Sequence, residues 1–379
     1  MIGTLRISTS ALRHNARLLR ELVGPQHAAF VVKGNAYGHG IAETALAIEG
    51  LAAKLCVYNV DEALELRDGG ITAPLLIMGP IPPERLDDAM ACDADVALWD
   101  TKSFARDLAQ AALRVQTRAR AHVKVNTGLN RLGLQPGDLP DAVEAYGRAN
   151  GLEIAGVFSH LAAAEELDSP YTMLQLERFN EAYQHAEPIL AARGFTPVRH
   201  IAASAAAMLW PQTRLDLSRF GIALYGLWPS AATKEAMNGG KLPLEPALSY
   251  ESELVVVRTI DAGDAVGYGI TYHAPRRMPI GVVPLGYADG IPRALSNKGS
   301  VLIDGMRCAI IGRVAMNMFF VDLSHAPSAH VGSKVTLIGS QDSQEISIDD
   351  WAAWSDSINY EIVSRLPSTL ARVYIEDRG

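Results

Sequence analysis

Lys33 ends an apolar run in the stretch AFVVKGNAYGHG, residues 29–40, and glycines follow it at positions 34, 38 and 40. A lysine in such a place can simply extend its ammonium from an apolar stem into solvent. The glycines favour a binding site, because they allow the backbone to approach a ligand closely, and Tyr37 places a hydroxyl beside the amine. An amine that its site makes less basic can form a Schiff base with an aldehyde, and pyridoxal phosphate is the commonest aldehyde cofactor of this kind.

Two later stretches could hold the phosphate and the ring nitrogen of such a cofactor. Ser204 follows a predicted strand in AASAAA, residues 202–207, and Arg219 precedes a glycine in SRFGIALYG, residues 218–226. The Ser204 hydroxyl and the backbone N–H groups of Gly221 and Ile222 could bind a phosphate. Taken alone, AASAAA is also typical of the start of a helix.

Strands alternate with helical patterns up to about residue 235, and this order must position the residues above. The predicted strands are AAFVV (28–32), LCVYNV (55–60), PLLIM (74–78), VALW (96–99), AHVKV (121–125), IAGVF (154–158), VRHIA (198–202) and LDLSRFGIALYG (215–226). Apolar residues recur at three and four positions between them, which indicates helices and therefore parallel crossovers. Eight such repeats predict an α/β fold, a (β/α)8 barrel, whose C-terminal strand ends carry the chemistry.

The pattern changes from about residue 240 to short strands separated by Gly, Asp, Pro and Ser turns, as in SVLIDGMRCAIIGRV and SKVTLIG. This predicts an all-β tail. We expect a barrel domain over residues 1–240 and a β-rich C-terminal domain over 241–379, with LEPALSY at 244–250 as the switch. The first eight or so residues are expected to pair with the C-terminal domain.

Composition excludes several classes of function. A net charge of −8 without a basic run argues against a nucleic-acid partner. The first twenty residues lack a continuous apolar segment, and no later run reaches membrane-spanning length, so we expect a cytoplasmic protein without a membrane partner. The three cysteines have no metal-like spacing, which fits a reducing compartment, and no metal site is expected.

Six ordered strings together resemble the bacterial alanine racemase family, namely VVKGNAYGHG, VNTGLNRLG, SRFGIALYGL, GYGITY, PLGYADG and INYEI. The resemblance spans nearly the whole chain. It implies a pyridoxal-phosphate enzyme that interconverts L- and D-alanine, supplies D-alanine for peptidoglycan and forms a homodimer with composite active sites. The residues that it implies are Lys33 and Tyr268 as catalytic bases, Tyr37, His160, Ser204, Arg219, Gly221, Ile222 and Tyr360 for the cofactor, and Arg131 with the backbone amide of Met316 for the substrate carboxylate.

Racemisation requires one base on each face of Cα, and the resemblance assigns these positions to Lys33 and Tyr268. A tyrosine with a reference pKa of about 10 needs assistance to act as a base. His160 is expected near Tyr268 and the cationic Arg219 close by, which would favour the phenolate. His160 could instead be a hydrogen-bonded histidine at a strand end, and Tyr268 an exposed turn aromatic. Because a guanidinium cannot give its proton to the pyridine, Arg219 is expected to favour proton return to Cα over transamination.

Two positions and one stretch depart from the family pattern. Asn317 in GRVAMNM and Asn126 in VNTG stand where the family commonly has aspartate, and VSRLPSTLARVY replaces the usual continuation of INYEI. Lys124 matches a lysine that many family members carry as a carbamate bridging to the arginine at position 131. Asn317 puts the steering of the substrate carboxylate in question, and not the family.

Three rival functions fit part of the same pattern. A pyridoxal-phosphate homeostasis protein shares the barrel but lacks a β domain, which the tail carrying Tyr268 opposes. A barrel-type amino-acid decarboxylase shares the cofactor half and has different tail motifs. A broad-specificity racemase usually carries a secretory signal. An assay against a panel of L-amino acids would separate these functions.

Overall fold

The computed structural model describes residues 3–99, 102–237 and 242–376 and divides into two compact units. The barrel unit comprises Ala11–Gly34 and Ile41–Glu245, and the β unit comprises Met1–Ser10, Asn35–Gly40 and Pro246–Gly379. The boundary predicted between residues 240 and 241 lies outside the described residues. We propose that the domain boundary lies a few residues later, because the barrel unit ends at Glu245 and the β unit resumes at Pro246.

Eight parallel strands form the barrel unit's sheet, in the order β8-β7-β6-β5-β4-β3-β2-β9. They are β2 (Ala28–Val31), β3 (Lys54–Val57), β4 (Leu75–Ile77), β5 (Ala94–Leu98), β6 (Ala119–Lys124), β7 (Leu152–Phe158), β8 (Val198–His200) and β9 (Ser218–Phe220). A parallel bridge from Ala203 to Arg219 joins the residue stretch after β8 to β9 and brings the sheet close to closure. The predicted eight-stranded barrel is therefore confirmed.

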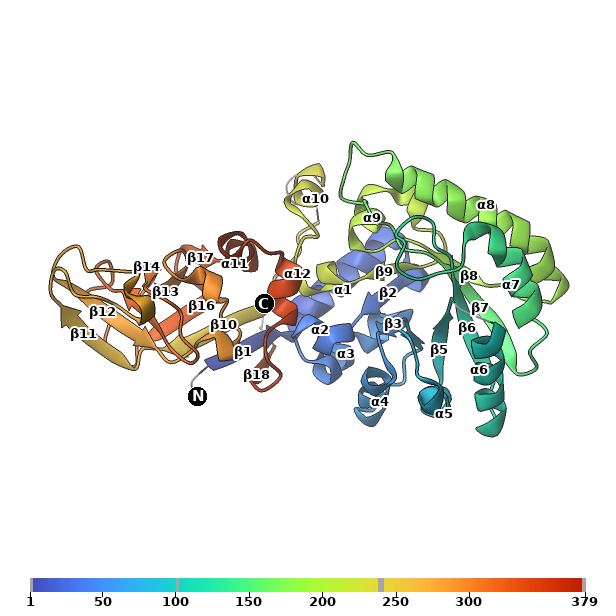
Figure 1. Ribbon diagram of the computed structural model, residues 1–379, viewed down its shortest axis with the longest axis horizontal. Coiled ribbons are helices and arrows are strands. Elements are labelled where there is room, and N and C mark those ends of the chain that lie inside the picture. The colour runs from blue at the N-terminus through green and yellow to red at the C-terminus, as the bar shows by residue number, and fades with distance from the viewer. Residues whose placement is uncertain (1–2, 100–101, 238–241, 377–379) are drawn as a thin grey trace. The chain divides into compact units, whose positions relative to one another are not determined.

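The barrel strands are short apolar runs because both of their faces are covered. Every residue of β2, β4 and β5 is buried, as expected of parallel strands with side chains inside the barrel and helices outside. Figure 1 shows α4 to α8 ranged along the outside of these strands. The helices are α1 (Thr9–Val23), α3 (Ile41–Ile48), α4 (Val60–Asp68), α5 (Leu86–Ala91), α6 (Lys102–Arg114), α7 (Leu139–Tyr146), α8 (Tyr171–Ala192), α9 (Ser204–Leu209) and α10 (Ala231–Ala236).

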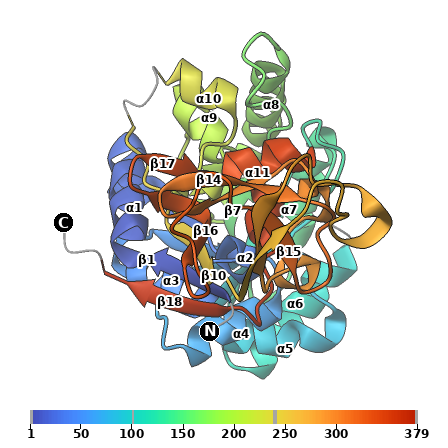
Figure 2. The same ribbon diagram turned by 90° about the vertical axis from the view of Figure 1, so that its left-hand side faces the viewer.

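Ten strands form the sheet of the β unit, and all their pairings are antiparallel except that of β1 with β18. They are β1 (Gly3–Ser8), β10 (Leu248–Glu253), β11 (Val256–Ile260), β12 (Met278–Val283), β13 (Ser300–Ile303), β14 (Met306–Ile311), β15 (Phe319–Asp322), β16 (Lys334–Gln341), β17 (Gln344–Ile346) and β18 (Ala371–Ile375). The N-terminal β1 lies between β10 and β18, with β18 at the edge of the sheet (Figure 2).

The β unit is not all-β as the pattern predicted, because two helices follow β17. They are α11 (Ile348–Ser355) and α12 (Asn359–Ser364). Ser347 starts α11 with a capping box, in which its hydroxyl accepts from the N–H of Asp350 and the Asp350 carboxylate accepts from the N–H of Ser347. Trp351, fully buried, donates from its indole N–H to the carbonyl of Leu337. The sequence prediction overlooked this cap.

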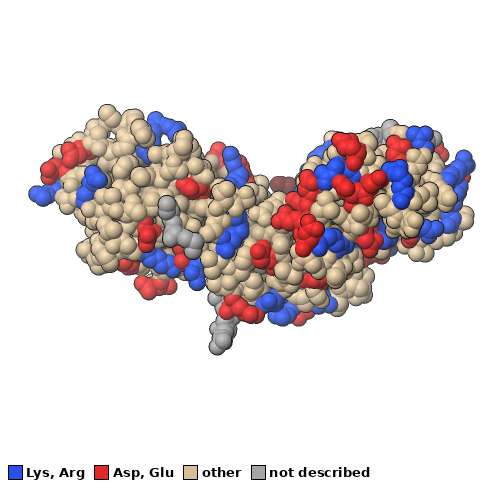
Figure 3. Space-filling view, turned by 90° about the horizontal axis from the view of Figure 1, so that it is seen from below, with Lys and Arg blue, Asp and Glu red and all other residues tan. Residues whose placement is uncertain are grey.

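No helix in the described ranges is long and apolar enough to cross a membrane. On the face of the molecule shown in Figure 3, basic and acidic side chains are interspersed. A mixed surface of this kind gives little long-range attraction for a polyanion.

Candidate active site

Lys33 lies just after β2, at the C-terminal end of the barrel's parallel strands. Glu62 accepts hydrogen bonds from the backbone N–H groups of Gly34 at 2.6 Å and Tyr58 at 2.7 Å, which ties the residue after Lys33 to the residue after β3. Burial, and after it the charge of Arg131, lowers the pKa of the Lys33 amine from its ordinary value, while Glu62 opposes this shift. More of the amine is therefore neutral and able to react with an aldehyde.

The backbone after Lys33 follows a left-handed turn, α2 (Lys33–Tyr37). The φ angle is positive at five consecutive residues, Gly34, Asn35, Ala36, Tyr37 and Gly38. This conformation costs roughly 1–2 kcal/mol for each residue that has a Cβ. At Gly38 a Cβ would also lie 2.0 Å from the carbonyl oxygen of Val363, so only glycine fits. Such strain persists where the surrounding structure holds it, and functional sites are a common place for it.

Arg219 lies on β9, next to β2 in the sheet, and is 3% exposed. Its Nη1 donates to Nδ1 of His200 at 2.6 Å, and its Nη2 donates to the carbonyl of Ser159 at 2.9 Å and contacts Nδ1 of His160 at 3.3 Å. Among the described residues, these contacts leave the Nε hydrogen and one Nη1 hydrogen for a ligand. Burial lowers the pKa of Arg219 to about 10, so the guanidinium stays charged at neutral pH.

Ser204 and Gly221 lie together at the strand ends of β8 and β9. The backbone N–H of Gly221 donates to the Ser204 hydroxyl oxygen at 3.1 Å, and Ser204 is the first residue of α9. Ile222, buried, begins the 3-10 turn over Ile222–Tyr225. AASAAA therefore does start a helix, as the alternative interpretation predicted. The Ser204 hydroxyl nevertheless lies against the backbone N–H of Gly221. The Ser204 hydroxyl hydrogen and the Ile222 N–H are suitable donors for a phosphate, and the Gly221 N–H would join them by exchanging the Ser204 oxygen for a phosphate oxygen.

The stretch after β6 carries Arg131, whose side chain is exposed. Asn126 shapes this loop, because its Oδ1 accepts from the backbone N–H groups of Gly128 at 3.3 Å and Asn130 at 2.9 Å. Its Nδ2 also donates to the side-chain oxygen of Asn130 at 2.9 Å. An amide oxygen accepts these bonds as a carboxylate would, so Asn126 is compatible with the loop despite its departure from the family pattern.

Lys124 and His160 are basic groups whose pKa values their surroundings lower. Lys124, 6% exposed, lies with its Nζ 5.4 Å from the centre of the Phe158 ring. Burial, followed by the charges of Arg219 and Arg131, lowers the pKa of Lys124 to about 8. The same causes, burial first, lower the pKa of His160 to about 3. His160 is therefore neutral at physiological pH, and its Nδ1 is an acceptor toward Arg219.

The other predicted residues, Tyr37, Tyr268, Met316 and Tyr360, belong to the β unit. The rings of Tyr37 and Tyr360 lie 6.2 Å apart, and Tyr360 is on α12. Tyr268 is 75% exposed and stands between two glycines of positive φ, Gly267 and Gly269. Met316 is 55% exposed.

Asn317 follows Met316 in the exposed loop between β14 and β15. The structure gives no account of why an amide stands there in place of the usual carboxylate.

Sequence reasoning missed the polar residues below Arg219 in the barrel, namely Asp95, His122 and His200. All three are buried. A signal was available: His122 and Lys124 are two residues apart on β6, so they face the same side of the strand. Since barrel interiors are usually filled by branched apolar residues, a strand with two inward polar residues indicates a polar interior.

Four histidines predict a loss of stability in acid. Burial is the largest cause that lowers the pKa of His39, His122, His160 and His200 below the ordinary value of 6.5. Below pH 6.5 the unfolded chain therefore binds protons that the folded chain does not, so stability falls as the pH falls. Each histidine contributes about 1.4 kcal/mol per pH unit. We expect the urea midpoint of unfolding to decrease steeply from pH 6.5 to 5.5.

The matched control for this prediction is His185→Gln, because His185 is exposed on α8. The variant should follow the same pH dependence as the parent protein. An unfolding midpoint that does not change between pH 6.5 and 5.5 would contradict the lowered pKa values of these four histidines.

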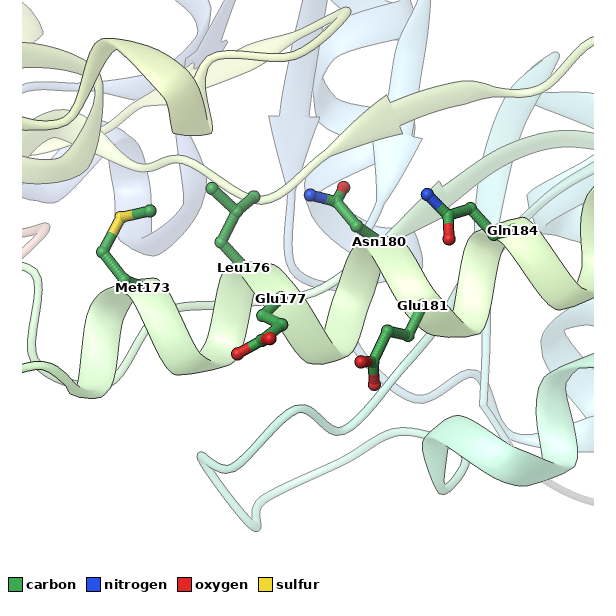
Figure 4. A pocket seen from close by; sticks show the side chains of 6 residues that line it. All are labelled: Met173, Leu176, Glu177, Asn180, Glu181 and Gln184. Carbon is green, nitrogen blue, oxygen red and sulfur yellow. The ribbon is translucent and has the colours of Figure 1, made fainter.

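A surface pocket of about 370 Å³ runs along α8, away from the predicted residues (Figure 4). Its lining consists of Met173, Leu176, Glu177, Asn180, Glu181 and Gln184. All six lie on one helix, and none is a predicted site residue. The strand ends around Lys33 carry its partly buried amine, the buried guanidinium of Arg219 and the candidate phosphate donors, so we place the candidate site there.

Comparison with known proteins matches both units of the chain to one family. Residues 7–229 match the family model described as alanine racemase, N-terminal domain, and residues 247–374 match the one described as alanine racemase, C-terminal domain. The alanine racemase of Desulforamulus reducens is 39% identical over 373 residues, which are 97% of this chain and 98% of the relative. The alanine racemase of Hahella chejuensis is also 39% identical, over 97% of this chain and 96% of the relative.

Solved structures of alanine racemases also resemble the chain over nearly its whole length. The alanine racemase of Streptomyces lavendulae, which produces D-cycloserine, superimposes with a TM-score of 0.92 at 36% identity, covering 100% of this chain and 98% of that one. The alanine racemase of Bacillus anthracis with bound L-Ala-P has a TM-score of 0.89 at 32% identity, covering 99% and 95%. Family models and relatives thus cover both units, and the chain belongs to the alanine racemase family of isomerases.

Proposed function

We propose that this protein interconverts L-alanine and D-alanine with pyridoxal phosphate as its cofactor. The observation that carries the proposal is the partly buried Lys33 amine of lowered pKa at a barrel strand end, in a chain of the alanine racemase family. Relatives named alanine racemase support the substrate. The cofactor is supported by three kinds of group near this strand end: an amine for its aldehyde, hydroxyl and N–H donors for its phosphate, and a guanidinium for its ring nitrogen.

Several residues would hold the cofactor. Lys33 would bind its aldehyde carbon covalently, and Arg219 would donate to its ring nitrogen with a hydrogen that the protein contacts leave over. The phosphate would be bound by the Ser204 hydroxyl and the N–H groups of Gly221 and Ile222, with Tyr37 and Tyr360 as further donors. His160 completes the set through its contact with Arg219. When bound, the cofactor supplies the electron sink that makes the Cα proton of the amino acid acidic.

Two bases on opposite faces of Cα would then invert its configuration. The Lys33 amine would be the base beside Cα on one face. Tyr268 is the proposed base on the other face. Arg131 and the backbone N–H of Met316 would bind the substrate carboxylate and fix the orientation of Cα between the two bases.

We further propose that the active sites are composite and that the protein is a homodimer, with Tyr268 of one copy serving the Lys33 of another. Lys33 and Tyr268 belong to different units of the chain, and the 75% exposure of Tyr268 is compatible with a role at a partner's site. We also propose that the protein lies in the cytoplasm and supplies D-alanine for peptidoglycan.

Lys124 is a candidate for carbamylation. Carbon dioxide reacts with a neutral amine, and a pKa of about 8 leaves roughly a tenth of the Lys124 amine neutral at pH 7, far more than for an ordinary lysine. A carbamate would also place a negative charge among Arg131, Arg219 and Lys33, whose positive charges lower that pKa. As the pH falls well below 8, protonation of the amine should disfavour the carbamate.

Arg219→Glu tests the proposed control of reaction type. A carboxylate at this position would stabilise a protonated ring nitrogen, whereas a guanidinium only donates a hydrogen bond and keeps its own proton. We expect racemisation to slow by about 10²-fold or more and pyruvate to form as a transamination product, measured in a single turnover with L-alanine. Arg219→Lys keeps a cation and should form little pyruvate. Equal pyruvate from parent and Arg219→Glu would show that Arg219 does not restrain transamination.

The experiment that tests the function is a steady-state assay of the purified protein with pyridoxal phosphate against a panel of L-amino acids. Formation of D-alanine from L-alanine with the highest kcat/KM is the expected result. Release of carbon dioxide, or turnover of larger or basic amino acids in preference to alanine, would replace the proposal with a decarboxylase or a broad-specificity racemase.

A further inference from the structure

A continuous chain of buried polar side chains runs through the barrel interior behind Arg219. Nη1 of Arg219 contacts Nδ1 of His200 at 2.6 Å, and Nε2 of His200 contacts Nδ1 of His122 at 2.8 Å. Nε2 of His122 in turn contacts Oδ2 of Asp95 at 2.9 Å. Four strands, β5, β6, β8 and β9, each contribute one residue. The chain thus connects a buried cation to a buried anion through two imidazoles.

The direction of every hydrogen bond in this chain follows from its two ends. A guanidinium can only donate, so Nδ1 of His200 must accept, and a neutral His200 must carry its hydrogen on Nε2. That Nε2–H donates to Nδ1 of His122, so His122 also carries its hydrogen on Nε2. The His122 Nε2–H then donates to the Asp95 carboxylate, which can only accept. Both imidazoles are fixed in one tautomer.

Burial and charge keep the groups in these states. His122 and His200 are both fully buried, and burial lowers the pKa of each, so neither is cationic at neutral pH. Asp95 is 2% exposed. Although burial alone would raise the pKa of Asp95, the hydrogen bond from His122 and the charge of Lys54 hold it well below its usual range.

Asp95 is anchored at the far end of the chain by two cations. Lys54 is ion-paired with its Oδ2, and Nε of Arg120 donates to its Oδ1 at 2.6 Å. Nη1 of Arg120 also donates to Asp93 at 2.8 Å, on a side chain that is 72% exposed. Asp93 therefore shares a partner with Asp95 and does not belong to the chain through His122.

We propose that Asp95, His122 and His200 are positioning residues that fix the orientation of Arg219 toward the reacting cofactor. The proposal rests on the proposed function, since it is the cofactor that Arg219 would contact. If His122 did not accept from it, the His200 imidazole could carry its hydrogen on Nδ1 and would then present a donor to the Arg219 donor. Arg219 would have to turn away from His200, and its remaining N–H groups would lose their direction.

The first test reads the tautomers directly and needs no substrate. Nitrogen NMR of the holoenzyme with ¹⁵N-labelled histidine, assigned by single His→Gln variants at positions 122 and 200, should find both imidazoles neutral with the hydrogen on Nε2. A hydrogen on Nδ1, or a cationic ring, for either residue at neutral pH would overturn the proposal. If the protein did not racemise alanine, this test would still stand, so the two proposals can fail separately.

The second test asks whether His122 acts through Arg219. His122→Phe removes the acceptor with little change in size, and we expect kcat to fall by about 10-fold or more. In an Arg219→Lys background, His122→Phe should lower kcat much less, because the Arg219–His200 hydrogen bond that His122 supports is already lost. Asp93→Asn, the matched control, should leave kcat unchanged. Equal losses from His122→Phe in both backgrounds would mean that His122 only stabilises the barrel, and would refute the positioning role.

Discussion

Lys33→Ala is expected to lower alanine racemisation by about 10⁴-fold or more, because the change removes both the covalent attachment point and one of the two bases. The purified parent protein should be yellow when it contains pyridoxal phosphate, and borohydride should fix the cofactor to Lys33. In Lys33→Ala the fixed label should be absent from peptide maps. Both effects follow from the partly buried Lys33 amine of lowered pKa at the end of β2.

Lys33→Arg separates chemistry from charge in this experiment. The variant keeps a cation at the strand end, but a guanidinium neither holds the aldehyde nor accepts a proton near neutral pH. It should be as inactive as Lys33→Ala. Lys234→Ala, an exposed lysine on α10, should be fully active. Recovery of the borohydride label on any other lysine of the parent protein would contradict the assignment.

Tyr268→Phe is expected to reduce racemisation by about 10²-fold to 10⁴-fold, the range for loss of one general base. Exchange of the Cα hydrogen with solvent should persist for one enantiomer of alanine, since Lys33 still serves its own face. The exchange is measured by proton NMR in deuterium oxide, separately for L- and D-alanine. Tyr183→Phe, on α8 of the barrel unit, should behave like the parent. Loss of exchange for both enantiomers would show that Tyr268 is not simply the second base.

The same two variants test whether sites are shared between copies. Lys33→Ala and Tyr268→Phe are mixed under conditions that exchange subunits. If Tyr268 acts on a partner's site, each mixed dimer has one site with both defects and one with neither, so activity returns. If Tyr268 acts within its own chain, every site keeps one defect. No recovery in demonstrated mixed dimers would refute the composite site and leave Lys33 unaffected.

The barrel could be predicted because its signal is local. Each strand is a short apolar run, since helices cover one face and the interior the other, and β2, β4 and β5 are buried at every residue. Lys33 could be predicted as a site residue for the same reason, since a strand end is visible in the sequence. The helices α11 and α12 were missed because strands dominate their surroundings and the Ser347 cap is a weak signal by itself.

His122 and Lys124 on one face of β6 indicate a polar interior, but the partners inside the barrel could not be predicted because they depend on contacts between distant strands. His122 and His200 are 78 residues apart, and only the closed sheet brings their rings to hydrogen-bonding distance. Composition and periodicity carry no information on such a pairing. The left-handed turn after Lys33 is similar, because Asn35, Ala36 and Tyr37 adopt positive φ only where the folded structure holds them.

The most direct test of the account is the origin of the hydrogen in the product. L-alanine is incubated with the holoenzyme in deuterium oxide, the reaction is stopped at low conversion, and the Cα isotope of the D-alanine formed is measured by mass spectrometry after chiral separation. Two bases on opposite faces predict D-alanine with deuterium at Cα, because the hydrogen delivered is not the one removed. D-alanine that keeps the substrate's own hydrogen, or no D-alanine at all, would contradict the account.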